Sequence, residues 1–128
     1  MGRRAALLLL AILAAGVPVQ SARADGDPGS DVLVYQPLFL AADANVSITQ
    51  QAQLGALLRQ ARDGGVPIRV SLIASQSDLG AITGLWLNPR AYARFLGLEL
   101  SLAYTGRLLV VMPNGFGFNW PGHSATSA

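Results

Sequence analysis

Cysteine is absent from the 128 residues of this chain. The chain can therefore form no disulfide framework, thiol redox centre, thiolate nucleophile, cysteine zinc site or N-terminal lipid-modified cysteine. A small domain without such cross-links must be held together by the packing of its core.

Histidine and phosphate-binding loops are almost as scarce. The only histidine, His123, lies in a polar tail, where the sequence provides nothing to hold it against a nucleophile. A lone histidine also argues against a histidine-based zinc site. Neither a G-x-G-x-x-G nor a G-x-x-x-x-G-K-S/T motif follows any predicted strand, so we expect no dinucleotide or Walker-type phosphate loop.

The first 24 residues have the anatomy of a secretory signal peptide. A basic start, Met1–Arg4, precedes an apolar run from Ala5 to Val17, and residues 21–24 supply the small-x-small pattern that signal peptidase cleaves. An uncleaved anchor helix would need about 20 apolar residues, and this run is shorter. We therefore expect cleavage after Ala24 and a secreted or periplasmic (extracytoplasmic) protein with no membrane span after cleavage.

The chain has no lysine, so all nine of its fixed cations are arginines. Three of them, Arg3, Arg4 and Arg23, belong to the predicted signal peptide, which leaves six arginines against seven acidic residues. The net charge of +2 therefore belongs to the targeting segment. No basic run survives cleavage, so we expect neither a nucleic-acid partner nor an anionic membrane partner.

The rest of the chain is long enough for one compact domain. Residues 25–31 contain three aspartates, but they lack the later glycine and the glutamate of an EF-hand, so they predict a flexible acidic leader. We place a single α/β domain at residues 32–121 and a polar tail at residues 122–128.

Capping residues and turn signals divide this domain into helices and strands. Ser47 and Gln50 have the spacing of a capping box, and Asn88 precedes a proline at a second helix start. Asp78 can cap a short helical segment. The predicted strands are residues 32–35, 67–74, 108–112 and 116–120, and the predicted helices run from Ser47 to Gly64 and over residues 79–87 and 89–104.

The resulting order is β-α-β-α-α-β-β, which predicts a mostly parallel sheet with helices on both faces. Residues 108–112 are continuously apolar, as a buried central strand requires. Asn114-Gly115 predicts a two-residue hairpin into a final antiparallel edge strand. Such a sheet normally needs a further helix over its open face, so we expect the sequence to be truncated at its C-terminus. That the functional residues lie beyond Ala128 is then a third alternative for the function.

Glu99 is the one charged residue that falls on the predicted core face of the last helix. A carboxylate in that position is costly unless it is paired or neutralised. It could be a metal ligand or an acid with a raised pKa. The interpretation that we favour is a structural ion pair with Arg69, the only charge on the second predicted strand.

The carboxyl ends of the predicted parallel strands carry oxygen-rich side chains. These ends carry Tyr35 and Gln36, then residues 75–78, then Asn114, and ligands of open parallel sheets bind beyond them. The candidate ligands are Asp78 and Asn114, with Asp43 from the loop after the first predicted strand. Such a rim could bind Ca²⁺ or Mg²⁺. The alternative is that Asp78 only caps its helix and Asn114 only forms its turn.

The predicted edge strand has an aromatic face. Phe116, Phe118 and Trp120 alternate along it, so their side chains share one side of the sheet. That face can pack on a C-terminal segment or on a partner protein.

Several blocks of the sequence resemble uncharacterised secreted proteins of G+C-rich, largely actinobacterial genomes. These blocks are GDPGSDVL at residues 26–33, IRVSLIASQSDLG at 68–80, PRAYARFL at 89–96 and LLVVMPNGFG at 108–117. More remotely, the order of elements resembles the TPM domain, an extracytoplasmic α/β module. That resemblance implies either phosphatase activity or a role in assembling or repairing membrane complexes. The acidic metal-site residues of the TPM family are not matched here, so no catalytic residue is carried over.

Two hypotheses follow from the sequence. The first is an exported, non-catalytic interaction module that binds an envelope or secreted protein. It is favoured because the sequence has no cysteine, no histidine held beside a nucleophile and no phosphate-binding loop, and because it has an aromatic edge strand. The alternative is a Ca²⁺- or Mg²⁺-dependent, phosphatase-like hydrolase of the TPM type, with Asp43, Asp78 and Asn114 around the cation.

Overall fold

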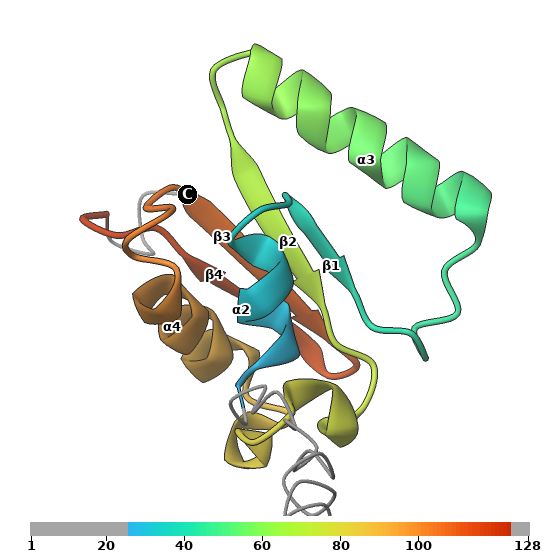
Figure 1. Ribbon diagram of the computed structural model, residues 1–128, viewed down its shortest axis with the longest axis vertical. Helices are drawn as coiled ribbons and strands as arrows, with labels where there is room; N and C mark the ends of the chain where they lie inside the picture. The colour runs from blue at the N-terminus through green and yellow to red at the C-terminus, as the bar shows by residue number, and fades with distance from the viewer. Residues whose placement is uncertain (1–25, 124–128) are drawn as a thin grey trace, which may run out of the picture.

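The structure is a computed structural model that describes residues 26–123. It is an α/β fold built on one four-stranded sheet in the order β1-β2-β3-β4, with β1, β2 and β3 parallel and β4 antiparallel to β3 (Figure 1). The predicted signal peptide lies outside the described residues. In chain order the elements are α2 (Pro28–Leu33), β1 (Leu38–Leu40), α3 (Ile48–Asp63), β2 (Ile68–Leu72), the 3₁₀ helices η1 (Gln76–Leu79) and η2 (Thr83–Leu85), α4 (Pro89–Glu99), β3 (Arg107–Met112) and β4 (Gly115–Asn119).

One face of the sheet carries the hydrophobic core. Leu108, Val110 and Met112 alternate along β3 and are buried against α4, whose Tyr92 and Leu96 are fully buried. Helices α2 and α4 lie together on this face (Figure 1). We call it the first face. Because side chains alternate along a strand, Leu109 and Val111 point to the opposite face.

The predicted helix starts are confirmed. Ser47 and Gln50 form both hydrogen bonds of a capping box at the start of α3, and the side chain of Asn88 accepts a hydrogen bond from the Ala91 N–H at the start of α4. The prediction that this last helix reaches Tyr104 is wrong, because α4 ends at Glu99. The chain then turns on the Leu100 carbonyl, which accepts hydrogen bonds from two later backbone N–H groups.

The predicted hairpin is also confirmed, but the two residues of its turn are Pro113 and Asn114, because Gly115 pairs with Met112 as the first residue of β4. Residues 108–112 of β3 pair with β4 in antiparallel register, and Asn114 lies in the turn between the two strands. Gly115 has a φ of 145°, a backbone conformation that side chains disfavour, so glycine is required there. The Asn114 amide donates a hydrogen bond of 2.7 Å to the Leu87 carbonyl and so attaches the turn to the loop before α4.

The start of the domain differs from the prediction. Residues 28–33 form the short helix α2, and the first strand is β1 rather than residues 32–35. The predicted solvated leader is wrong for Asp27, Gly29 and Ser30, which are all buried. Asp27 caps the helix by accepting a hydrogen bond from the Gly29 N–H, and the following proline occupies the first helical position.

The segment after β2 also differs. In place of one helix over residues 79–87, the chain forms the two short 3₁₀ helices η1 and η2. Gly80 separates them with a φ of 59°, and a side chain at this position would collide with the Gly26 carbonyl. Asp78 lies inside η1, where its Oδ2 accepts hydrogen bonds from the Ala74 and Ser75 N–H groups. The backbone at Gly80 therefore prevents a continuous helix.

Three polar groups meet inside the core. The Tyr92 hydroxyl donates a hydrogen bond of 2.6 Å to Asp27 Oδ1, and Asp27 is 3% exposed. Neither Asp27 Oδ2 nor the Ser71 hydroxyl has a partner within the described part of the chain. Burial raises the pKa of Asp27 although the hydrogen bonds from Tyr92 and Gly29 oppose the change, and burial likewise raises the pKa of Tyr92.

No helix among residues 26–123 is long and apolar enough to span a bilayer.

We predict that Asp27→Asn flattens the pH dependence of stability. The pKa of Asp27 is higher in the folded state than its ordinary value of 3.8, so the native protein binds more protons as the group titrates. Its contribution is therefore fully present below pH 3.8 and is lost as the pH rises through the folded-state pKa. Asparagine keeps the Oδ1 acceptor and cannot ionise, so the variant is more stable than the wild type at neutral pH.

Urea unfolding from acid to neutral pH measures this effect. The control is Glu99→Gln, which removes an exposed carboxylate that has no part in raising the pKa of Asp27, so the slope due to Asp27 should remain. A wild-type slope that survives in Asp27→Asn would contradict the assignment.

We also predict that Gly117→Ala destabilises the packing of β4 on α4. A Cβ at this position would overlap the Pro89 carbonyl. Overpacking of this kind costs about 1–3 kcal/mol, which lowers the melting midpoint of a domain of this size by roughly 4–8 °C per kcal/mol. Thermal unfolding measures the change. Gly84→Ala is the matched control because its Cβ meets open space, and equal midpoints for the two variants would contradict the prediction.

Candidate functional site

The second face of the sheet, opposite α2 and α4, is apolar and partly open. Cross-strand partners share a face, and the register places Phe118 beside Leu109 and Phe116 beside Val111. Phe116 is 72% exposed and Phe118 is 36% exposed, while the two β3 residues are half-buried. We call these four residues the aromatic edge. Helix α3 contacts the sheet chiefly through β2 and lies to one side of it in Figure 1, so it leaves this edge open.

Trp120 follows β4 and continues the alternation predicted from the sequence. The Arg107 guanidinium lies 3.9 Å from the centre of the indole ring, and the His123 ring stacks on the indole with a centroid distance of 3.4 Å. Trp120 is half-buried by these contacts. The exposed aromatic surface is therefore carried by the two phenylalanines, and Trp120 forms its sheltered end.

The carboxyl rim of the sheet brings together two of its three predicted ligands. Hydrogen bonding to the Ser75 side chain lowers the pKa of the exposed Asp43 carboxyl, and a hydrogen bond with Asp78 acts in the same direction. Asp43 and Asp78, which follow β1 and β2, therefore lie near each other at this rim.

Other contacts already occupy much of this rim. Asp78 Oδ2 is held by two backbone N–H groups, at 2.9 and 2.7 Å, and the Asn114 amide nitrogen is bound to the Leu87 carbonyl. Within residues 26–123, no three acidic or histidine side chains gather as a metal cluster would require. Asn114 lies in the turn as considered, whereas the predicted cap at Asp78 is wrong: Ser75 is the N-cap of η1, and Asp78 lies inside η1 and binds the backbone that precedes it.

The predicted core position of Glu99 is wrong. The buried stripe of α4 runs through Tyr92, Ala93 and Leu96, and it continues to Leu100, which leaves Glu99 exposed at the end of the helix. The ion pair with Arg69 is not formed. In the part of the chain that the structure describes, the one salt bridge joins Arg62 to Asp63, both exposed.

Arg69 instead holds the end of α2. Its Nη1 donates hydrogen bonds to the carbonyls of Leu33 and Val34, and its guanidinium lies 4.2 Å from the centre of the Tyr104 ring. The last carbonyls of a helix lack partners within the helix, and a cation is favourable at that end. This contact explains why a charged side chain is tolerated on the first face.

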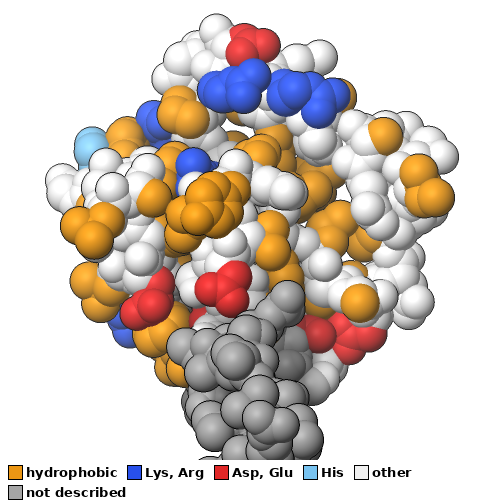
Figure 2. Space-filling view, viewed as in Figure 1, with side chains coloured by type: hydrophobic (Ala, Val, Ile, Leu, Met, Phe, Trp, Pro, Cys, Tyr) orange, Lys and Arg blue, Asp and Glu red, His pale blue; other side chains and the backbone are white. Residues whose placement is uncertain are grey.

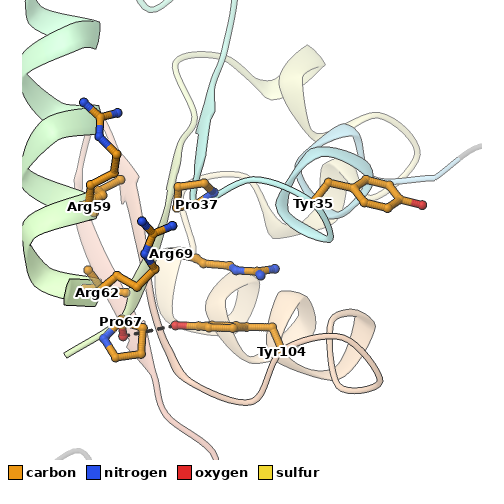
Figure 3. A pocket seen from close by; sticks show the side chains of 9 residues that line it. Tyr35, Pro37, Arg59, Arg62, Pro67, Arg69 and Tyr104 are labelled. Carbon is orange, nitrogen blue, oxygen red and sulfur yellow. Dashed lines mark hydrogen bonds between the residues drawn. The ribbon is translucent and has the colours of Figure 1, made fainter. Parts of the chain in front are cut away.

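A pocket of about 170 Å³ lies between α3 and the amino ends of the strands, and no sequence prediction anticipated it. Figure 3 shows Arg62 reaching from α3 toward the strands and Arg69 lying over the Tyr104 ring. Arginine side chains also gather at the top of Figure 2, where α3 ends. The polar lining is Tyr35, Arg59, Arg62, Arg69 and Tyr104, and the apolar lining is Pro37, Leu58, Pro67 and Ile68.

One sequence signal could have found part of this pocket. Arg59 and Arg62 are three residues apart on a helix, a spacing that places two side chains on the same face. The third cation, Arg69, comes from β2, and only the fold brings it near the other two.

Comparisons with family models, with curated proteins and with solved structures found no match to this chain.

We predict that Ca²⁺ and Mg²⁺ leave the melting midpoint of the protein unchanged. A ligand that binds only the folded state at 100 times its Kd would stabilise it by about 2.7 kcal/mol. The carboxyl rim is poorly suited to bind a cation because the Asp78 and Asn114 side chains already form hydrogen bonds with the backbone. Thermal unfolding with chelator and then with excess cation measures the effect. A rise that Asp43→Asn abolishes and Asp63→Asn preserves would contradict the prediction.

Proposed function

We propose that this chain is an exported, non-catalytic interaction module, and that its partner is an exported protein presenting an apolar strand to β4. The observation that carries the proposal is the exposure of Phe116 and Phe118 on an edge strand. Export rests on the predicted signal peptide and implies a secreted or periplasmic partner.

The chemistry of β4 supports a strand as the partner. It is the last strand of the sheet, so one side of its backbone faces no other strand of the described chain. Such an edge is a template for another strand, with the backbone supplying hydrogen bonds and alternate side chains supplying specificity. Phe116 and Phe118 are two residues apart and point to the same side, so an added strand would cover both with its own apolar residues.

The packing of the hairpin on α4 holds β4 in a fixed position, as a binding surface requires. Gly117 lies against the Pro89 carbonyl on the first face, so the β4 backbone packs closely on α4. The partner would therefore meet a strand that is already in place and would lose little free energy in ordering it.

We predict that Phe118→Ser weakens partner binding about ten- to a hundredfold. Removing a phenylalanine from an apolar interface costs about 1.5–3 kcal/mol, which corresponds to that change in Kd. A photo-cross-linking residue at position 116 in the secreting cell identifies the partner, and titration of the two purified proteins gives the Kd. Phe116→Ser tests the same surface at a more exposed position, where the substitution spares the core.

Leu98→Ser is the matched control because Leu98 is 75% exposed on α4, away from the aromatic edge. It should bind as the wild type does. A chain that stays monomeric and cross-links to nothing from position 116 would refute the proposal, and so would a partner whose Kd is the same for all three variants.

The metal-dependent hydrolase is the alternative proposal, and the meeting of Asp43 and Asp78 at the carboxyl rim favours it. It requires hydrolysis of an aryl phosphate that depends on added metal and is lost in Asp78→Asn. Activity that is insensitive to chelator and to this substitution would remove it.

A further inference from the structure

We propose that the pocket between α3 and the amino ends of β1 and β2 binds a phosphate group. Three of its lining residues, Arg59, Arg62 and Arg69, carry positive charge, and its lining contains no carboxylate. This site lies at the opposite end of the strands from the carboxyl rim and is independent of the aromatic edge.

Two of the cations are available to a ligand. Arg59 and Arg62 are exposed and follow the same face of α3. Arg62 is paired with Asp63 at 3.3 Å, but both partners are largely exposed to water, and such a pair contributes little. A phosphate can therefore displace Asp63 from Arg62 at small cost, and it would relieve the repulsion between neighbouring guanidinium groups.

The third cation is fixed before any ligand arrives. Arg69 Nη1 is bound to two carbonyls at the end of α2, and Tyr104 supports the guanidinium from below (Figure 3). Its Nε and Nη2 have no acceptor in the described part of the molecule. Partial burial lowers the pKa of Arg69, so a nearby anion would favour its charged form.

The arrangement favours phosphate over carboxylate. A planar carboxylate is satisfied by one arginine through two parallel hydrogen bonds. Here Arg62 reaches from α3 toward the strands, while the guanidinium of Arg59 points along α3 and that of Arg69 points toward α2 (Figure 3). The exposed side chains of Arg59 and Arg62 would turn toward a tetrahedral anion held at Arg69. The pocket is smaller than the roughly 300–1,000 Å³ of sites that enclose drug-sized ligands. It therefore fits one phosphate group, either free or at the end of a larger molecule.

The experiment is an NMR titration of the purified protein with inorganic phosphate, with acetate as the planar anion. We expect saturable shifts of backbone amides around residues 59, 62 and 69, and weaker binding of acetate. The double variant Arg59→Gln/Arg62→Gln should bind phosphate at least about tenfold more weakly, because hydrogen bonds to charged groups are among the stronger ones. Both side chains are exposed, so the variant keeps its fold, which its own spectrum verifies.

The matched control is Arg90→Gln/Arg94→Gln, which removes the same charge from two exposed arginines spaced along α4. It should bind as the wild type does. Equal loss in the two double variants would show non-specific attraction and overturn the proposal, as would the absence of saturation in the wild type. Sedimentation with vesicles of phosphatidic acid then distinguishes a lipid headgroup from a soluble phosphate, with phosphatidylcholine vesicles as the control. If the phosphatidic acid vesicles sediment the wild type but not the Arg59→Gln/Arg62→Gln variant, the ligand is a lipid. If phosphate binding saturates but the vesicles do not sediment the protein, the ligand is soluble.

Discussion

The hydrogen bond from the Tyr92 hydroxyl to Asp27 joins residues 65 positions apart and fixes the start of the domain onto its core. Tyr92 is fully buried, and a buried hydroxyl without a partner is costly, so the ring can occupy this place only if an acceptor lies beside it. Asp27 supplies that acceptor and also caps α2 with the same oxygen, Oδ1. The packing of α4 and the position of α2 therefore depend on one side-chain oxygen.

The other end of α2 is held by Arg69, so a helix of only six residues is fixed by side chains at both of its termini. Such a short helix is unstable alone, because the entropic cost of nucleating its first turn is offset by too few later hydrogen bonds. The contacts come from α4 at one end and from β2 at the other, and together they close the first face of the sheet. The second face has no comparable closure, and its phenylalanines remain exposed.

Caps and turns that depend on a few neighbouring residues could be predicted from the sequence. Ser47 with Gln50, Asn88 with the following proline, and Asn114-Gly115 each specify a cap or a turn within a few residues. Both caps and the hairpin are confirmed, and the turn lies one residue earlier than predicted, at Pro113-Asn114. The apolar run of residues 32–35 is too short for its period to distinguish a strand from a helix. The cap and proline at Asp27-Pro28 favour the helix that the structure contains. The sequence placed Glu99 on the buried face of α4 because the predicted helix continued to Tyr104. The helix ends at Glu99, which is exposed.

The site residues divide in the same way. Alternation along β4 is a local property, so the common side of Phe116 and Phe118 could be predicted from the sequence. The meeting of Asp43 with Asp78 follows from the rule that parallel strands end at one edge. The arginine pocket has no such basis, because Arg69 joins Arg59 and Arg62 only where α3 crosses the amino ends of the strands. A search for basic runs cannot detect cations that the fold assembles from separate elements.

The aromatic edge and the arginine pocket lie on parts of the sheet that the core does not use. Ile68 lines the pocket, and its register with Arg107 places it on the same side of the sheet as Val70 and Leu109. Its apolar side chain therefore links the pocket to the second face, across the half-buried residues of β2 and β3. Helices α2 and α4 pack on the first face. Residues that bind a ligand or a partner can therefore lie on the second face and at the strand ends without disturbing the contact between Asp27 and Tyr92. Apart from Arg69, which both holds α2 and lines the pocket, the residues that stabilise the fold are separate from those that remain free to bind a ligand or a partner.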